Sequence, residues 1–255
     1  MRRLRRHIAE LQMAFLLLTR LPAGRLADNL PEMAAASWAF PLAGLAVGCG
    51  IGGSYIGFVL LGLPALLAAV LALATGLVLT GALHEDGLAD CADGFGGGQT
   101  RAQKLKIMKD SRVGTYGVLA LIIIMAARIA TLSTFPADLN SLMLIISLAM
   151  ISRLNMLAFL AYLPAARPDG LGHSASTPNS LSAGIAAVLC VPAILCCSSL
   201  VIYALLAAAT AGMYFALLSR RQIGGQTGDV CGAAQILSET AGWLCLASLF
   251  TSASV

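Results

Sequence analysis

Charge is scarce in this sequence: only 11% of its 255 residues are Asp, Glu, Lys or Arg, whereas an average soluble domain has about 25%. Hydrophobic residues make up 58% of the chain, and the mean hydropathy is +0.86. So few charges cannot cover a surface that faces water. The composition therefore excludes a soluble globular enzyme and a disordered chain, and it indicates a protein embedded in lipid.

Cysteine pairing and strong net charge are also missing. The seven cysteines include no C-x-x-C pair, so neither a zinc ribbon nor a redox pair is indicated, and we interpret them as apolar packing residues. A net charge of +4 is too modest to indicate nucleic-acid binding. The 16 basic and 12 acidic residues therefore carry the information about function.

Long apolar segments alternate with polar connections. A membrane-spanning helix needs about 20 apolar residues, and seven segments approach that length: 38–61, 65–83, 113–134, 139–163, 181–197, 200–218 and 231–250. We divide the segment 181–197 from the segment 200–218 near Ser198 and Ser199. If these two segments form a single span, the count is six. We predict an all-α, polytopic membrane bundle of about seven transmembrane helices, forming one domain over residues 1–255.

Basic residues gather on alternate connections. All of them except Arg128 and Arg153 precede the first span or follow the second, fourth or sixth. Because cytoplasmic loops collect Lys and Arg, this pattern predicts an inner-membrane protein with its N-terminus and these loops in the cytoplasm. Residues 1–30 are basic and only briefly apolar, which predicts a helix lying along the membrane surface rather than a signal peptide.

The connection 84–112, a cytoplasmic loop in this orientation, holds a cluster of aspartates. Asp86, Asp90 and Asp93 are spaced i, i+4, i+7, which places them on one face of a helix. Like charges so close together repel one another unless something neutralises them. Mg²⁺ prefers carboxylate and phosphate oxygens, so it is the expected cofactor. A solvated acidic face is the alternative, but the small residues between the aspartates favour a metal site.

Basic residues follow the aspartates directly. Lys109 and Arg112 are candidate catalytic residues, because phosphoryl transfer depends on positioning and on charge neutralisation. Arg101 is a candidate substrate contact, although ordinary anchoring at the cytoplasmic face explains it equally well. Residues 167–173 form another polar loop, which we interpret as a lid whose His173 is more typical of a solvated loop residue than of a catalyst.

A glycine-rich segment opens the last span. Gly224 and Gly225 are expected to leave backbone N–H groups free, and with Thr227 they precede a helix N-terminus, which favours phosphate binding. Asp229 adds a carboxylate from a second helix. Arg153 lies inside a predicted span, where a charge is a functional candidate, and we assign it to substrate binding; Arg128 lies nearer the other end, which favours a structural pairing.

Three of these segments, in order along the chain, resemble the cobalamin synthase family of inner-membrane adenosylcobinamide-GDP ribazoletransferases. The motif H-E-D-G-L-A-D-C-A-D-G at 84–94 resembles the family's H-L-D-G-L-A-D-T-A-D-G, with Glu85 in place of leucine. K-I-M-K-D-S-R-V-G-T-Y-G at 106–117 and G-G-Q-T-G-D-V-C-G-A at 224–233 resemble two further family motifs, the first with Lys106 in place of an acidic residue.

The resemblance implies a Mg²⁺-dependent transferase at the end of cobalamin synthesis. It joins adenosylcobinamide-GDP to α-ribazole or its 5′-phosphate and releases GMP. On this reading Asp86, Asp90 and Asp229 hold the metal, and Asp93 either ligates it or accepts the hydroxyl proton. Lys109 and Arg112 then stabilise the leaving GMP. Homo-oligomerisation and association with other enzymes of the pathway stay open.

Two other functions compete with this one. A CDP-alcohol phosphotransferase also places aspartates at the cytoplasmic end of membrane helices. Its D-G-x-x-A-R motif is absent here, because D-G-L-A at 86–89 is followed by Asp90 and no arginine comes directly after it. A cation transporter is the alternative from another class. Transporters hold their binding charges near the bilayer midplane, whereas these carboxylates lie in a loop rich in Lys and Arg.

Overall fold

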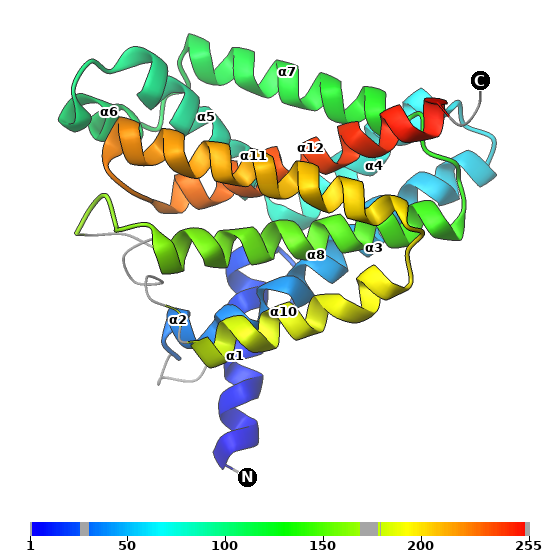
Figure 1. Cartoon of the computed structure of the whole chain (residues 1–255), viewed down its shortest axis with the longest axis horizontal. Coiled ribbons are helices and arrows are strands. Elements are labelled where there is room, and N and C mark those ends of the chain that lie inside the picture. The colour runs from blue at the N-terminus through cyan, green and yellow to red at the C-terminus, as the bar shows by residue number, and fades with distance from the viewer. Residues whose placement is uncertain (1, 26–30, 169–177, 179, 253–255) are drawn as a thin grey trace.

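The computed structural model describes residues 2–25, 31–168, 178 and 180–252, and within these residues the chain is helical, with one isolated bridge between Ala165 and Gln226. Most of the long helices lie side by side (Figure 1). The elements are α1 (Arg2–Leu18), α2 (Met33–Ala36), the 3₁₀ helix η1 (Ser37–Ala39), α3 (Phe40–Leu60), α4 (Ala65–Thr80), α5 (Leu83–Gly97), α6 (Arg101–Ile107), α7 (Thr115–Leu132), α8 (Leu139–Tyr162), α10 (Ser180–Leu195), α11 (Leu200–Ile223) and α12 (Gly228–Ser252).

The predicted helical membrane bundle is confirmed, with a lower number of full-length spans. Each of the seven predicted apolar segments contains a helix, and the chain breaks between α10 and α11 where we divided it. Within the described residues, five segments are long and apolar enough to cross a membrane, or six if α4 and α5 form one bent span. The helices α4 and α10 have 16 residues each, which is shorter than the predicted segments.

The helices α8 and α12 form the centre of the bundle. In the most apolar 18-residue stretch of α8 and of α12, 67% and 72% of the residues are buried. In α7 and in α11 the buried share is 28%, so most residues of these two helices are left to face lipid. Close packing of α3 on α8 depends on small residues. A Cβ atom on Gly44 would lie 2.5 Å from the carbonyl oxygen of Ala149, and one on Gly48 would lie 2.8 Å from Cα of Ile146.

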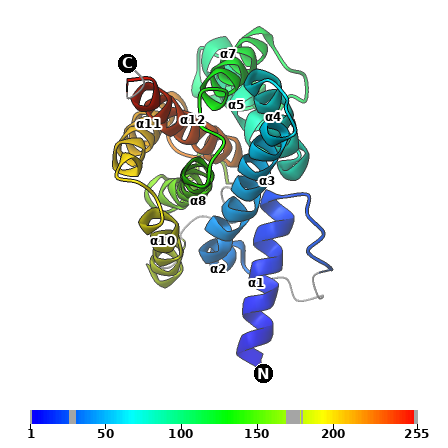
Figure 2. The same cartoon turned by 90° about the vertical axis from the view of Figure 1, so that its right-hand side faces the viewer.

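Polar connections gather at one end of the bundle. Figure 1 shows α6, the segment 163–168 and the segment 224–227 at the same end, whereas the turns 61–64, 133–138 and 196–199 lie at the other. The helix α1 runs across the direction of the spans (Figures 1 and 2), as a helix lying along a membrane surface would. The basic connections after the second, fourth and sixth predicted spans therefore share one end, as the alternation of basic loops predicts.

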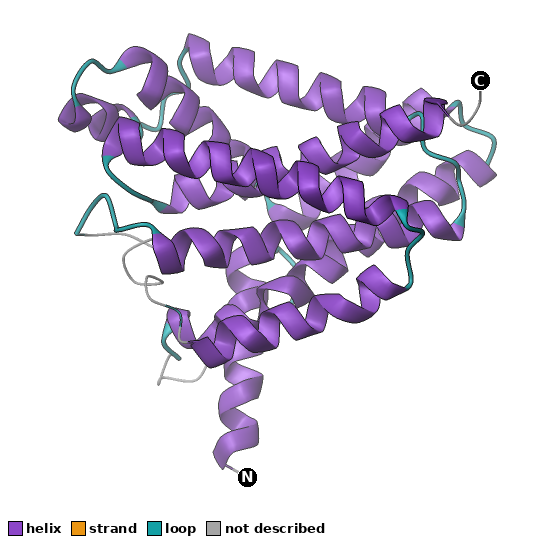
Figure 3. Ribbon diagram, viewed as in Figure 1, coloured by secondary structure: helices purple, strands orange, loops and turns teal. Residues whose placement is uncertain are grey.

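The cytoplasmic connection predicted at 84–112 is largely helical (Figure 3), and α5 is the helix that the spacing of its aspartates predicts. The helix α4 ends at Thr80, its C-cap Gly81 has φ +65°, and Ala82 follows with φ +57°. These two left-handed residues turn α5 by 90° relative to α4. The buried side of α5 then packs against α7 and α12, so its aspartates are carried by a rigid helix.

Candidate active site at the polar end of the bundle

The acidic face of α5 meets the start of α12. Gly87 is the point of closest approach, because a Cβ atom there would lie 2.6 Å from the carbonyl oxygen of Asp229. Asp86 and Asp229 line the same pocket. The structure therefore brings together carboxylates that are far apart in the sequence, as expected for Asp86, Asp90 and Asp229.

Asp90 experiences the charge of this cluster most strongly. It lies on α5, outside the predicted span 65–83. Burial, followed by the nearby charges of Asp229, Asp86 and Asp93, raises the pKa of its carboxyl group from 3.8 to about 7, and Arg167 opposes this only in part. The cluster is therefore short of positive charge, and a bound cation would stabilise its ionised form.

Arg167 is a site residue to which the sequence analysis gave no contact of its own, since it treated Arg167 as a marker of topology and as the first residue of the predicted lid loop. Its Nη2 donates to Oδ2 of Asp229 at 2.8 Å, and the two side chains are 14% and 28% exposed. Backbone pairing holds the segment in place: Ala166 N donates to Gln226 O and Gln226 N donates to Pro164 O, both at 2.8 Å. No local pattern reveals this ion pair, since it joins the connection after α8 to the first turn of α12.

Asp93 faces the beginning of α7. Its two carboxylate oxygens accept hydrogen bonds from the backbone N–H groups of Gly114, at 2.7 Å, and Gly117, at 2.9 Å. A carboxylate at a helix N-terminus is stabilised by the helix dipole. These contacts make Asp93 an anchor for the motif 106–117.

Two predicted catalytic cations, Lys109 and Arg112, lie on the exposed connection that Asp93 anchors. Arg112 pairs with its neighbour Asp110 at 2.8 Å, and the hydrogen bonds from Arg112 lower the pKa of the Asp110 carboxyl to about 2. The guanidinium is therefore held on the surface beside the site rather than among the aspartates.

Arg101 connects three segments at this end. Its Nη2 donates to the carbonyl oxygen of Ala166 at 3.1 Å, and its guanidinium lies against Gly224. Lys104 of the same helix donates to Gln222 of α11. The observed partners of Arg101 are thus protein groups, so the structure supports a role in holding α6 against the connections around α8, α11 and α12.

The glycine-rich segment before α12 is not the open amide cradle that we expected at Gly224. The N–H of Gly224 donates to Arg220 O at 3.1 Å, and its φ of +81° ends α11. Position 225 requires glycine, because a Cβ atom there would collide with the carbonyl oxygen of Pro164. Thr227 begins α12: its Oγ1 accepts from Val230 N at 3.3 Å and donates to Asp229 Oδ2 at 3.2 Å.

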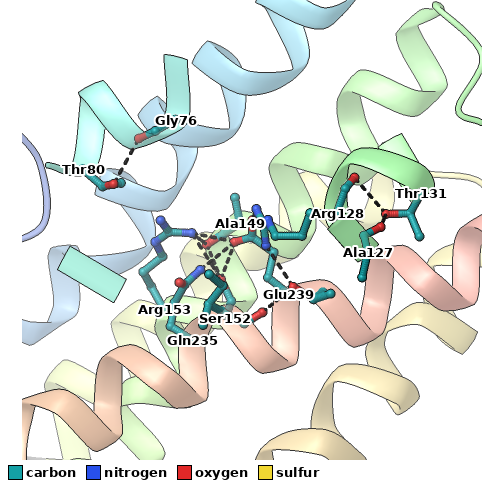
Figure 4. A network of polar contacts seen from close by, with 12 residues as sticks. Gly76, Thr80, Ala127, Arg128, Thr131, Ala149, Ser152, Arg153, Gln235 and Glu239 are labelled. Carbon is teal, nitrogen blue, oxygen red and sulfur yellow. Dashed lines mark hydrogen bonds and ion pairs between the residues drawn. The ribbon is translucent and has the colours of Figure 1, made fainter. Parts of the chain in front are cut away.

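Arg153 belongs to a buried ionic network in the bundle, shown in Figure 4. Its Nη1 lies 2.8 Å from Oε2 of Glu239, whose Oε1 lies 2.7 Å from Nη2 of Arg128. The structural pairing expected for Arg128 is confirmed, and its guanidinium also lies 4.1 Å from the centre of the Trp243 ring. Arg153 is only 2% exposed, so the structure gives it a partner in the core instead of a path to substrate.

This network lies directly beneath the acidic helix. His84 and Glu85, the residues just before Asp86, line a small polar cavity together with Arg153 and Glu239. Sequence reasoning did not recognise Glu239 as the common partner of the two arginines. The only available signal was that an acidic residue in an apolar helix needs compensation.

The donor atoms at the polar end suit a hard cation that substrate helps to bind. Among the described residues, no group of three or more Asp, Glu, His or Cys side chains is arranged to hold a metal ion. Mg²⁺ commonly takes one or two carboxylates and completes its shell with phosphate oxygens and water. Asp86, Asp90 and Asp229 therefore suit a cation that one or two of their carboxylates hold together with substrate phosphate, and they do not form an all-protein cage. His173 of the expected lid lies outside the described residues.

Comparison with known proteins reveals extensive similarity. The family model described as cobalamin-5-phosphate synthase matches residues 10–247. An adenosylcobinamide-GDP ribazoletransferase of Bradyrhizobium diazoefficiens is 43% identical over 235 residues, which cover 90% of each chain. Enzymes with the same name from Azorhizobium caulinodans and Mesorhizobium japonicum are 42% and 40% identical, over 87% and 93% of this chain and 88% and 92% of their own. No solved structure matches the chain.

Proposed function

The chain belongs to the cobalamin-5-phosphate synthase family, and we propose that the cluster of Asp86, Asp90 and Asp229 is the centre of its ribazole transfer. In this reaction a hydroxyl of α-ribazole, or of its 5′-phosphate, attacks the phosphorus that stays with the corrinoid of adenosylcobinamide-GDP. The bond from that phosphorus to the oxygen of GMP breaks, GMP leaves, and the hydroxyl proton passes to a base.

The observation that carries this assignment is the meeting of α5 and α12 at Gly87 and Asp229. It places acidic side chains from two helices at the polar end, next to a pocket that both helices line. We assign Mg²⁺ to Asp86, Asp90 and Asp229; when bound, it neutralises carboxylate and diphosphate charge and so favours departure of GMP.

The other residues of the site orient these groups. Arg167 fixes Asp229 through the ion pair at 2.8 Å. Asp93 holds the connection that carries Lys109 and Arg112 against α5 through its bonds to Gly114 and Gly117. We assign to Lys109 and Arg112 the stabilisation of charge on the leaving nucleotide, because both are exposed cations on the connection beside the cluster, where a phosphate enters from solvent.

We place the site at the cytoplasmic face of the inner membrane. The polar end of the bundle carries the basic connections, and cytoplasmic loops collect such residues. Cysteine accessibility tests this orientation in intact cells. A cysteine introduced at Gln99, on the exposed connection before α6, should react with a membrane-impermeant maleimide only after the cells are opened.

Substitution of single carboxylates tests the chemistry. Membranes containing the protein should release GMP from adenosylcobinamide-GDP when α-ribazole and Mg²⁺ are supplied. We expect Asp90→Asn and Asp229→Asn to lower this rate by at least about 100-fold, because each removes a charged oxygen ligand. Asp138→Asn is the matched control: Asp138 is the N-cap of α8 at the opposite end, and asparagine caps a helix equally well.

Two results would overturn the proposal. One is near-normal GMP release by Asp90→Asn at saturating Mg²⁺, which would remove the metal assignment. The other is metal-ion flux through vesicles without any nucleotide chemistry, which would favour a transporter.

A further inference from the structure

A pocket opens beside the acidic cluster, between α1, α3, α5, α8 and α12. Its cavity volume is about 100 Å³, which is below the range of about 300–1,000 Å³ for sites that bury a whole small molecule, so it suits one small apolar group of a substrate. Its walls are mainly apolar and include Leu17, Leu18, Phe40, Met156 and Leu160. None of these apolar side chains has a role in the ribazole transfer proposed above for the polar groups.

The charged side chains that line this pocket are accessible to solvent. Among the described lining residues, Asp86 and Asp229 are the charged ones, and both are partly or fully accessible, whereas Leu18 and Phe40 are buried. An occupant therefore needs an apolar body for the interior and a polar group that reaches two carboxylates at the opening. Because those carboxylates belong to the proposed catalytic cluster, that polar group is expected to be a reacting one.

The two substrates offer four bodies: guanine, the adenine of the adenosyl group, the corrin macrocycle and the base of ribazole. Both purines carry polar groups along their edges, and burying these against Leu and Phe side chains without partners would cost free energy. The corrin macrocycle is larger than the pocket and is fringed with amide side chains. The base of ribazole is a dimethylbenzimidazole, flat and bicyclic, with methyl groups at its outer edge.

We infer that this pocket receives the benzimidazole base of the acceptor nucleoside and leaves its ribose beside Asp86 and Asp229. The inference rests on the proposed function, since the acceptor is a substrate only if the chain transfers ribazole. The pocket then acts as the specificity element for the acceptor: it holds the base by apolar contact and orients a ribose hydroxyl towards the cluster.

A pair of neighbouring substitutions on α1 tests this inference. Leu17 lines the pocket, whereas Leu16 is 42% exposed and does not line it. We expect Leu17→Trp to raise the KM for α-ribazole by at least about tenfold, since it fills space that the base needs. The KM for adenosylcobinamide-GDP should change by less than about twofold. Leu16→Trp should leave both KM values near those of the wild type.

Inhibition by the free base provides a test that needs no variant. Added 5,6-dimethylbenzimidazole should inhibit GMP release competitively with α-ribazole and non-competitively with adenosylcobinamide-GDP. Competition with adenosylcobinamide-GDP, or a rise in its KM alone in Leu17→Trp, would overturn the inference and assign the pocket to the donor. Absence of both inhibition and any KM change would also overturn it and would favour a lipid chain as the occupant.

These outcomes are distinct from failure of the proposed function. If the wild-type protein releases no GMP from adenosylcobinamide-GDP, the function itself is wrong. If it does release GMP, but neither the KM values of Leu17→Trp nor inhibition by the free base distinguishes acceptor from donor, only the pocket assignment is wrong.

Discussion

Gly87 of α5 lies against the backbone of Asp229 of α12, so closely that a Cβ atom at Gly87 would lie 2.6 Å from the Asp229 carbonyl oxygen. Backbone cannot yield as a flexible side chain does, so Gly87→Ala must push the two helices apart. We expect GMP release to fall by at least about tenfold, because small displacements of catalytic groups are costly.

The control for this change is Gly53→Ala on α3. A Cβ atom at Gly53 meets nothing within 4 Å, and alanine stabilises a helix interior by about 0.5–1 kcal/mol relative to glycine. Gly53→Ala should retain full activity and equal or higher thermal stability. Full activity in Gly87→Ala as well would contradict the close contact of α5 and α12 at the site.

The buried triad of Arg128, Glu239 and Arg153 predicts a large stability effect. Glu239→Gln would leave two guanidinium groups in the core without their shared carboxylate. Breaking a buried ion pair in this way typically destabilises a protein by about 3–5 kcal/mol. We expect a lower midpoint of thermal unfolding in detergent micelles.

A double variant tests the coupling within this triad. Adding Arg153→Met to Glu239→Gln removes one of the stranded charges, so the double variant should be less destabilised than the sum of the two single variants. Strict additivity would show that the three side chains do not act as one network.

The spacing of Asp86, Asp90 and Asp93 was sufficient to predict a shared helical face, because periodicity depends only on local geometry. The direction of that helix was not predictable. It depends on the left-handed pair Gly81 and Ala82, and an alanine in that conformation has no sequence signature. For this reason the aspartate face was predicted, whereas the 90° bend between α4 and α5 was not.

Partners across the bundle were equally inaccessible to sequence reasoning. Arg153 and Glu239 belong to different helices, and in the sequence each is an isolated charge in an apolar segment. The pairing of Arg167 with Asp229 depends on backbone hydrogen bonds between two connections. Such contacts follow from tertiary packing, which periodicity and composition do not encode.

The titration of Asp90 predicts that Mg²⁺ stabilisation depends on pH. Burial and the neighbouring carboxylates raise its pKa in the folded protein to about 7 from 3.8. The folded state therefore retains a proton that the unfolded chain releases, and without a cation this group reduces stability as pH rises from about 4 to about 7. The increase in melting temperature on adding Mg²⁺ should be small near about pH 5.5 and larger near about pH 8.

Asp90→Asn provides the control for that dependence. Since asparagine does not titrate, the variant should show a weaker Mg²⁺ effect that changes little between the two pH values. An equal Mg²⁺ effect at both pH values in the wild type would contradict a cation bound by the ionised carboxyl of Asp90.

Asp93→Asn separates anchoring from metal binding. Both carboxylate oxygens of Asp93 accept backbone hydrogen bonds, from Gly114 and Gly117, whereas an asparagine amide has only one acceptor oxygen and leaves one N–H unpaired, at a cost of about 1–3 kcal/mol. If Asp93 acts as an anchor, kcat should fall while the Mg²⁺ concentration for half-maximal rate stays within about twofold of the wild type. Asp86→Asn, which alters an assigned ligand on the same helix, should raise that concentration by at least about tenfold. A similar rise in Asp93→Asn would instead assign Asp93 to the metal, because loss of a positioning contact alone does not change how strongly the remaining carboxylates hold a cation.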